Sequence, residues 1–254
     1  AGVVSLSSVA QAQEAAAGAE ALAASTTLSG YVSSSYTFEG ESNGAPIGAT
    51  NRDSDNFKLD VVSLTLASAQ GAGEYATGYT VQFWAGPDNG AESSDDASLE
   101  QANIDLRLPF GNGIDLKVGK FGTVVGNEVF DYNSNAFFQR SQAFGSQPTH
   151  HTGVLAGYNV TDDVAVQLGF ANDTTSATTN DSADDGSSAM LASLSYTLPD
   201  SMGFAGGTAI TLATVRGASA VGTPEVDRDN TYLGVSLPSV VENLSIDFAA
   251  DWGE

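Results

Sequence analysis

Hydrophobic and polar residues alternate at every second position through most of this chain, from Thr27 onward. In the segment 164–171, valine, leucine and phenylalanine hold the even positions, and alanine, glutamine and glycine hold the odd ones. A period of two places successive side chains on opposite faces of a β-strand, so the pattern predicts an all-β fold. A change of phase at Val61-Val62 predicts a β-bulge. The predicted strands are residues 27–39, 57–69, 75–86, 98–109, 114–125, 152–161, 164–173, 188–198, 207–217, 230–238 and 244–253.

The connections between these segments alternate in length. The long ones are 40–56, 87–97, 126–151, 174–187 and 218–229, and the short or moderate ones are 70–74, 110–113, 162–163, 199–206 and 239–243. Barrels of bacterial outer membranes have short periplasmic turns, long outer loops and strands of this length. We therefore predict a transmembrane, antiparallel up-and-down β-barrel with Thr27 on the periplasmic side. A soluble secreted β-sandwich is the alternative, but it has no reason to sort its loops by length.

The limits of the barrel follow from its strand count. Eleven strands are visible, whereas bacterial barrels have an even number, so we expect a complete barrel of about 12–18 strands with its C-terminal strands missing here.

No uncharged apolar run reaches the roughly 20 residues of a membrane-spanning helix. Residues 1–12 are interpreted as a signal-peptide remnant, 13–26 as a periplasmic lead-in and 27–254 as the barrel. An alanine-rich helix is the alternative reading of the N-terminal region.

The chain is strongly acidic, with a net charge of −23. This charge argues against nucleic acid and anionic lipid as partners. Roughly half of the 31 acidic residues lie in the long loops, which contain only Arg52, Arg140 and Arg228 as basic residues. The outer mouth is therefore expected to attract cations, although a merely solvated acidic surface would have the same composition.

One hairpin, residues 98–125, carries charged residues on its polar face. If residues 110–113 form the turn, Arg107 lies opposite Asp115, and Asp105 lies opposite Lys117. Charged pairs are costly in lipid, so this face is predicted to line an aqueous pore and to tune its ion selectivity. A solvated face of a soluble sheet is the alternative.

The loop 126–151 is too long and too aromatic for an exposed connection. We expect it to fold into the barrel as a constriction, where Arg140 opposes Glu128 or Asp131. Folding over the rim is the alternative.

Aromatic residues also gather near the predicted strand ends, which is typical of interfacial girdles but also of ordinary strands. They are Tyr31, Tyr36, Phe38, Tyr75, Phe83, Trp84, Phe110, Phe121, Tyr196, Tyr232 and Trp252.

No catalytic or tight metal site is predicted. His150 and His151 are adjacent, so on a strand they point to opposite faces and do not chelate one ion; a hydrogen-bonding role at the strand start is favoured. With no cysteine and no other histidine, neither zinc binding nor Ser/His/Asp hydrolysis has support. Loose bridging of calcium by the acidic loops is an alternative, although their aspartates do not have the spacing of an EF-hand. The weak calcium candidates are Asp181, Asp184, Asp185, Asp227 and Asp229.

The block 119–158 carries a family resemblance. It contains Gly119-Lys120-Phe121, then Gly126-Asn127-Glu128, then Asn135 to Ser141 in the pattern N-x-x-F-x-R-S, and finally His151-Thr152-Gly153-Val154. This order resembles the OmpL-like β-barrel porin-2 family. The resemblance implies a bacterial outer-membrane pore, no enzyme and a longer chain; outside this block the similarity is only a pattern of strands and acidic loops.

The sequence therefore favours an outer-membrane porin without a cofactor, through which small hydrophilic solutes or ions diffuse passively, with a preference for cations. Its surroundings would be the outer-membrane bilayer, and a homotrimer is expected by analogy with general porins. The alternative is a structural or surface-interaction barrel whose acidic outer loops are bridged by calcium.

Overall fold

The computed structural model describes residues 25–37, 56–88, 97–174, 188–219, 226–239 and 244–253. All eleven predicted strands are present, within a few residues of the expected bounds. They are β1 (Thr26–Thr37), β2 (Asn56–Ser68), β3 (Thr77–Ala85), β4 (Ala97–Leu108), β5 (Ile114–Gly122), β6 (His150–Asn159), β7 (Val164–Ala171), β8 (Ala189–Thr197), β9 (Ala209–Ser219), β10 (Val226–Leu237) and β11 (Ile246–Gly253).

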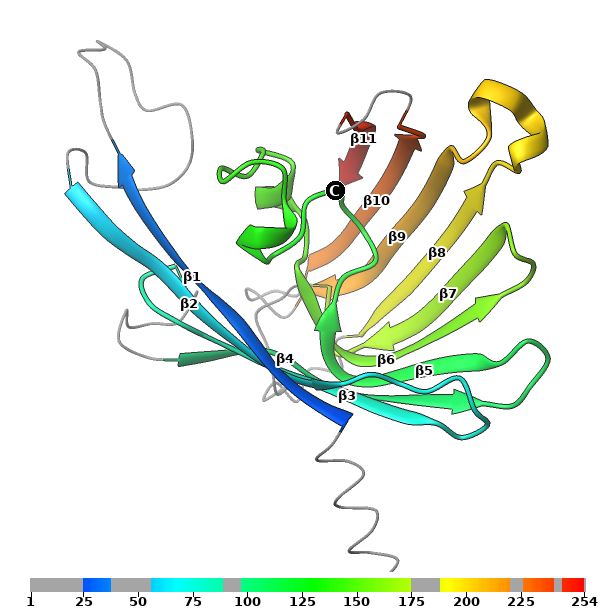
Figure 1. The fold of residues 1–254 in the computed structure, drawn as a ribbon, viewed down its shortest axis with the longest axis horizontal. Helices are drawn as coiled ribbons and strands as arrows, with labels where there is room; N and C mark the ends of the chain where they lie inside the picture. The colour runs from blue at the N-terminus through cyan, green and yellow to red at the C-terminus, as the bar shows by residue number, and fades with distance from the viewer. Residues whose placement is uncertain are drawn as a thin grey trace, which may run out of the picture.

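These strands form one antiparallel sheet in which each strand pairs with its neighbours in the sequence, in the order β1 to β11. This is the predicted up-and-down topology. The sheet curves strongly, β1 and β11 form its two edges, and the segment between β5 and β6 lies on its concave side (Figure 1). Sequential hairpins give every inner strand two hydrogen-bonded neighbours, which satisfies its backbone without help from side chains or water.

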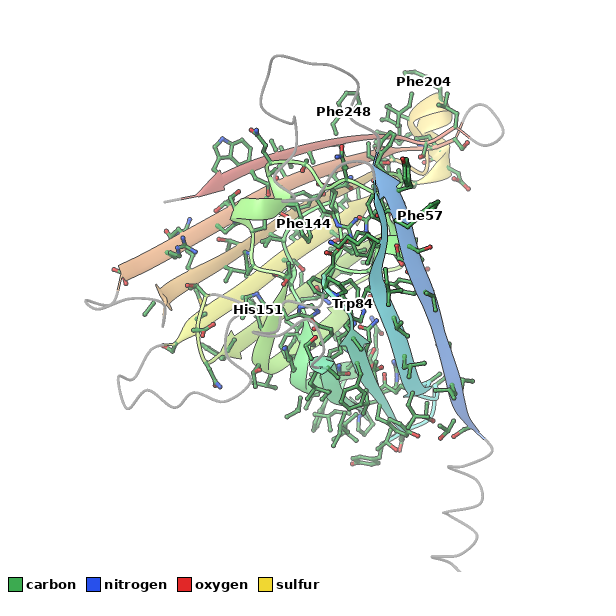
Figure 2. All side chains as sticks on the ribbon, turned by 90° about the vertical axis from the view of Figure 1, so that its left-hand side faces the viewer. Phe57, Trp84, Phe144, His151, Phe204 and Phe248 are labelled. Atoms are coloured by element: carbon green, nitrogen blue, oxygen red, sulfur yellow. The ribbon has the colours of Figure 1, made fainter. Side chains whose placement is uncertain are left out.

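The two faces of the sheet differ in the way that the alternation predicts. The convex face exposes large apolar side chains on most strands, among them Leu28, Ile104, Leu168, Phe170, Met190, Leu212 and Phe248. Leu106, Leu116 and Val166 belong to the same face and are half-buried. In Figure 2, Phe57 and Phe248 project away from the sheet, whereas Trp84 and His151 lie among the side chains of the concave side. An exposed apolar convex face is the surface that lipid would cover.

Two bulges bend the sheet near β1 to β4. In β2 the register shifts so that Asp60 is the extra residue, next to the predicted phase change at Val61-Val62. Asp60 and Val61 are both fully buried, and Asp60 accepts hydrogen bonds from Ser33 and Ser35. The second bulge, at Glu100 in β4, was not predicted. Because a bulge increases local twist, the pair directs this part of the wall around the concave side.

The loop lengths agree with the sequence except near the C-terminus. Strands β9 and β10 continue into the predicted long loop 218–229, so only residues 220–225 separate them. Conversely, the connection between β8 and β9 covers 198–208 and contains η3 (Asp200–Ala205). The strict long–short alternation therefore fails here, because alternating residues such as Asp227 and Asp229 extend the ladder beyond the expected turn.

Among the residues that the structure describes, no helix is long and apolar enough to cross a bilayer. The predicted signal remnant 1–12 and nearly all of the lead-in 13–26 lie outside the described residues.

Candidate functional site

Two ion pairs mark the concave face of the β4–β5 hairpin. The register places Arg107 opposite Asp115 and Asp105 opposite Lys117, as predicted. The Arg107 guanidinium donates to both Asp115 carboxylate oxygens, at 2.9 and 3.0 Å, and Lys117 Nζ donates to Asp105 Oδ1 at 2.6 Å. All four side chains are partly exposed, so this stretch of the face is charged, solvated and electrically balanced.

The segment between β5 and β6, residues 123–149 (the β5–β6 segment), is tied to the opposite part of the wall. Asp131 Oδ1 accepts a hydrogen bond from Gln82 Nε2 at 2.8 Å and another from the Tyr31 hydroxyl at 3.2 Å. The Tyr31 hydroxyl accepts in turn from the backbone N–H of Tyr132 at 3.1 Å. These bonds join residues 49 to 101 positions apart and fix the segment against β1 and β3.

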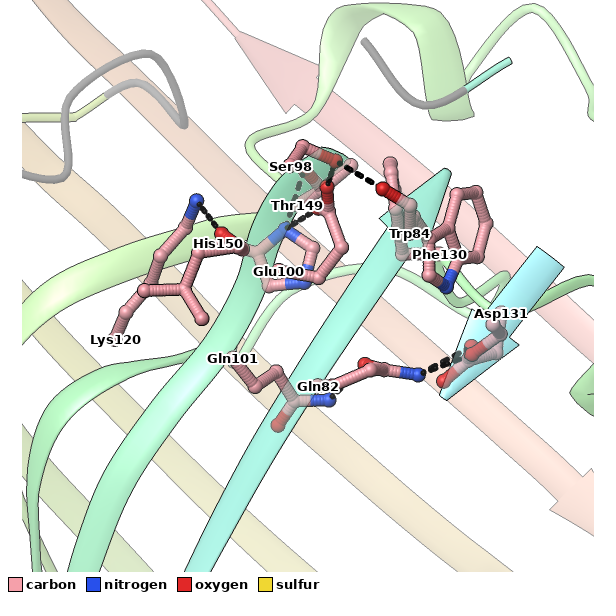
Figure 3. Close-up of polar contacts among 12 residues, drawn as sticks. Gln82, Trp84, Ser98, Glu100, Gln101, Lys120, Phe130, Asp131, Thr149 and His150 are labelled. Atoms are coloured by element: carbon pink, nitrogen blue, oxygen red, sulfur yellow. Dashed lines mark hydrogen bonds and ion pairs between the residues drawn. The ribbon is translucent and has the colours of Figure 1, made fainter. Parts of the chain in front are cut away.

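Aromatic stacking reinforces the same attachment. Trp84 is fully buried on the concave face of β3, and its ring centroid lies 4.2 Å from that of Phe130 and 5.7 Å from that of Tyr132. Tyr31 meets Trp84 edge-on at 6.3 Å. Figure 3 shows Phe130 beside Trp84 and the Gln82 amide directed at Asp131. Buried aromatic pairs add about 0.5–1.5 kcal/mol each to their burial, so this cluster contributes to the attachment of the segment in addition to the hydrogen bonds.

The residues of the N-x-x-F-x-R-S pattern hold the β5–β6 segment in its own fold. The Asn135 side chain bonds both the N–H and the carbonyl of Val129, each at 2.9 Å. Phe138 stacks on Tyr132 at 4.9 Å. The backbone N–H of Ser141 donates to both carboxylate oxygens of Glu128, at 3.0 Å each. The motif thus specifies a compact segment with two short helical turns, η1 (Tyr132–Ser134) and η2 (Phe144–Ser146).

Arg140 differs from the expectation. It forms no ion pair with Glu128 or Asp131; its Nη2 donates to the Phe130 carbonyl at 2.6 Å. The guanidinium lies over the rings of Tyr132 and Phe144, 4.7 and 5.2 Å from their centroids. Burial lowers the pKa of Arg140, although an arginine remains charged in proteins. The expected ion pair is absent because both carboxylates accept hydrogen bonds from other residues. Glu128 accepts from the Ser141 backbone N–H, and Asp131 accepts from Gln82 of β3.

On its other side, the β5–β6 segment rests on an apolar floor. Val124 and Val125 pack against buried concave-face residues of β5 to β10, which include Phe121, Leu155, Leu191, Val215 and Tyr232. This floor extends to Tyr232 on β10, the strand next to the edge strand β11. The segment therefore contacts both flanks of the curved sheet and stands across its concave side.

The floor corrects one expectation from the sequence. Trp84, Phe121 and Tyr232 do not belong to an interfacial girdle, because they are buried on the concave face. Tyr36, Phe83, Phe110 and Trp252 are exposed, and Phe38 lies outside the described residues. Gln82 and Tyr31 were not identified as partners of the loop, since nothing in the local sequence relates them to Asp131.

The histidines and acidic residues form no metal site in the described part of the chain, where no group of three or more histidine, cysteine, aspartate or glutamate residues is close enough to hold an ion. His150 Nδ1 hydrogen-bonds the Thr149 hydroxyl at 3.1 Å, and His151 Nε2 bonds that of Thr123 at 3.0 Å. Of the calcium candidates, Asp181, Asp184 and Asp185 lie outside the described residues. Asp227 and Asp229 are on β10, where Asp229 lies 3.8 Å from Arg216.

Comparison with protein families gives one match. The family model described as "Putative beta-barrel porin-2, OmpL-like" matches residues 25–235. This range includes β1 to β9, most of β10 and the whole β5–β6 segment. Neither the curated proteins nor the solved structures gave a match.

Proposed function

The chain belongs to the OmpL-like β-barrel porin-2 family, and from this membership we propose that it is a passive, cation-preferring pore for small hydrophilic solutes in a bacterial outer membrane. No bond is made or broken in this activity. The proposal includes the assignment of Asp105, Arg107, Asp115 and Lys117 to the pore wall, and of the β5–β6 segment, with Glu128, Asp131 and Arg140, to its constriction.

The observation that carries the proposal is the difference between the two faces of the sheet. The convex face exposes aliphatic and aromatic side chains on most strands, whereas the concave face carries ion pairs, amides and hydroxyls beside the apolar floor that the β5–β6 segment covers. Only a surface in contact with lipid favours the first arrangement, and only contact with water favours the second. A soluble sandwich would have the apolar face packed away from solvent.

The β5–β6 segment supports a fixed rather than a mobile constriction. It is held by Asp131 on one flank, by the apolar floor on the other and by Arg140 internally. Since a well-packed segment keeps its position, solutes would be sorted mainly by size and charge. The cation preference is attributed to the acidic surplus of the whole chain and its outer loops, because the ion pairs of the β4–β5 wall are balanced.

Single-channel recording in planar bilayers tests this proposal. With KCl gradients, we expect discrete conductance steps and a reversal potential that shows cation preference at low salt. The preference should weaken toward 1 M salt, where the screening length falls to about 3 Å. Anion preference at low salt, or no conductance by correctly inserted protein, would contradict it.

The variant Lys117→Gln tests the pore-wall assignment. It leaves the Asp105 carboxylate, now 2.6 Å from Lys117 Nζ, without its cation. A unit charge acts on an ion 4 Å away with about 1 kcal/mol in water, so at low salt the permeability of the cation should rise, and that of the anion fall, by up to about fivefold, and their ratio should rise accordingly. The double variant Asp105→Asn/Lys117→Gln is neutral at this position and should restore the wild-type ratio. An unchanged ratio in the single variant would remove this pair from the conduction pathway.

A further inference from the structure

A hollow of about 340 Å³ lies on the concave face between β4 and β8. Its walls include the ion-paired Asp105 and Lys117, together with Gln167 of β7 and Ser193 of β8. Leu155, which also belongs to the apolar floor under the β5–β6 segment, forms part of its lining. A solute that has passed this segment would therefore meet the hollow next.

The charged groups of the hollow are already compensated. Lys117 donates to Asp105 Oδ1 at 2.6 Å and to Asn103 Oδ1 at 3.2 Å. Both carboxylate oxygens of Asp115 accept hydrogen bonds from the Arg107 guanidinium. A simple ion gains little from a neutral pair. The attraction of a charged group to one member of such a pair is largely offset by its repulsion from the other, so an ion or zwitterion gains little more here than a neutral solute with the same hydrogen bonds.

Several polar groups nevertheless retain hydrogen-bonding capacity. Gln167 accepts from the Ser193 hydroxyl through its Oε1 at 3.0 Å, and its Nε2 donates to no acceptor within the described residues. The Lys117 ammonium has three N–H groups, of which two are used. The carboxylates of Asp105 and Asp115 have further lone pairs. Donors and acceptors thus stand side by side around the apolar surface of Leu155.

We propose that this hollow is a weak binding subsite for a neutral polyhydroxylated solute of about the size of one sugar ring. Each hydroxyl accepts from Gln167 or Lys117 and donates to a carboxylate, and no ion pair has to open. The C–H face of the ring lies against Leu155. This inference rests on the proposed pore function, and it names the class of solute that such a pore would favour.

Glucose and glutamine, a polyol and a zwitterion of similar size, test the subsite in the full-length protein. The readouts are the KCl conductance of single channels and the concentration dependence of its reduction by each solute. We expect conductance with a saturable reduction by glucose, and a weaker, non-saturating effect of glutamine. Gln167→Leu should raise the half-saturating glucose concentration about five- to tenfold, since it removes one or two hydrogen bonds. Thr65→Val, on the concave face of β2 outside the hollow, is the matched control and should behave as wild type.

The outcomes separate this inference from the proposed function. Normal conductance with a non-saturating glucose effect, or with Gln167→Leu equal to Thr65→Val, would overturn the subsite and leave the pore intact. Saturation by glutamine rather than glucose would overturn the assignment to neutral polyols. Absence of conductance in the wild type would overturn the pore and the subsite together.

Discussion

Replacing Trp84 with alanine is expected to release the β5–β6 segment from the wall and to lower the free energy of unfolding by about 3–5 kcal/mol. The indole is 1% exposed and contacts the rings of Tyr31, Phe130 and Tyr132. Its removal leaves a cavity that the curved strand cannot fill by moving. Without the indole, only hydrogen bonds such as those of Asp131 hold this flank of the β5–β6 segment against the wall. The single-channel current should therefore become larger and noisier. Urea unfolding in lipid vesicles and planar-bilayer recording measure the two effects.

Phe83→Ala is the matched control for this variant. Phe83 precedes Trp84 on β3 but belongs to the convex face and is 47% exposed. Its truncation removes lipid-facing area without touching the β5–β6 segment, so the loss of stability should be smaller and the current noise unchanged. If the current noise of both variants equalled that of the wild type, Trp84 would not anchor a constriction.

Gly119→Ala is expected to destabilise the β4–β5 hairpin by at least about 2 kcal/mol. Gly119 has φ +125°, a conformation that side chains disfavour. A Cβ at this position would also meet the backbone of β4, at the Ala102 carbonyl and 2.9 Å from Asn103 Cα. The strands would have to separate beside the Asp105–Lys117 pair. Chemical unfolding followed by tryptophan fluorescence measures the loss.

Gly122→Ala, at the C-terminal end of the same strand and three residues after Gly119, provides the comparison. A Cβ on Gly122 would meet no heavy atom within 4 Å. This variant should unfold within about 0.5 kcal/mol of wild type, as surface substitutions usually do. If the two variants were equally stable, the backbone of β4 would lie farther from Gly119 than it does in the structure.

The strands and the hairpin register were predictable because both depend on local rules. A period of two identifies a strand, and a short turn at residues 110–113 fixes which residues face each other across β4 and β5. The pairs Arg107–Asp115 and Asp105–Lys117 follow from that turn alone. The extent of β9 and β10 did not follow, because alternation in a loop and in a strand look alike until a neighbouring strand pairs with it.

The concave face was harder to anticipate, because both phases of some strands are apolar. On β8, Met190 and Leu194 are exposed on the convex face, whereas Ala189 and Leu191 are buried on the other. Periodicity separates the two sets but does not say which one faces lipid. In the same way, the loop was recognised as too aromatic for solvent, but its sequence could not show that Trp84 would receive Phe130.

The sequence by itself determined the all-β class, the strand order, the charged hairpin and the family, because these depend on patterns within one strand, one turn or one motif. The tertiary structure decided where the β5–β6 segment lies, which partners Arg140 and Asp131 have and where the hollow opens. The physical reason is that these contacts join residues far apart in the chain, such as Tyr31 and Asp131. Such pairs become neighbours only when the curvature of the whole sheet brings its flanks around one segment.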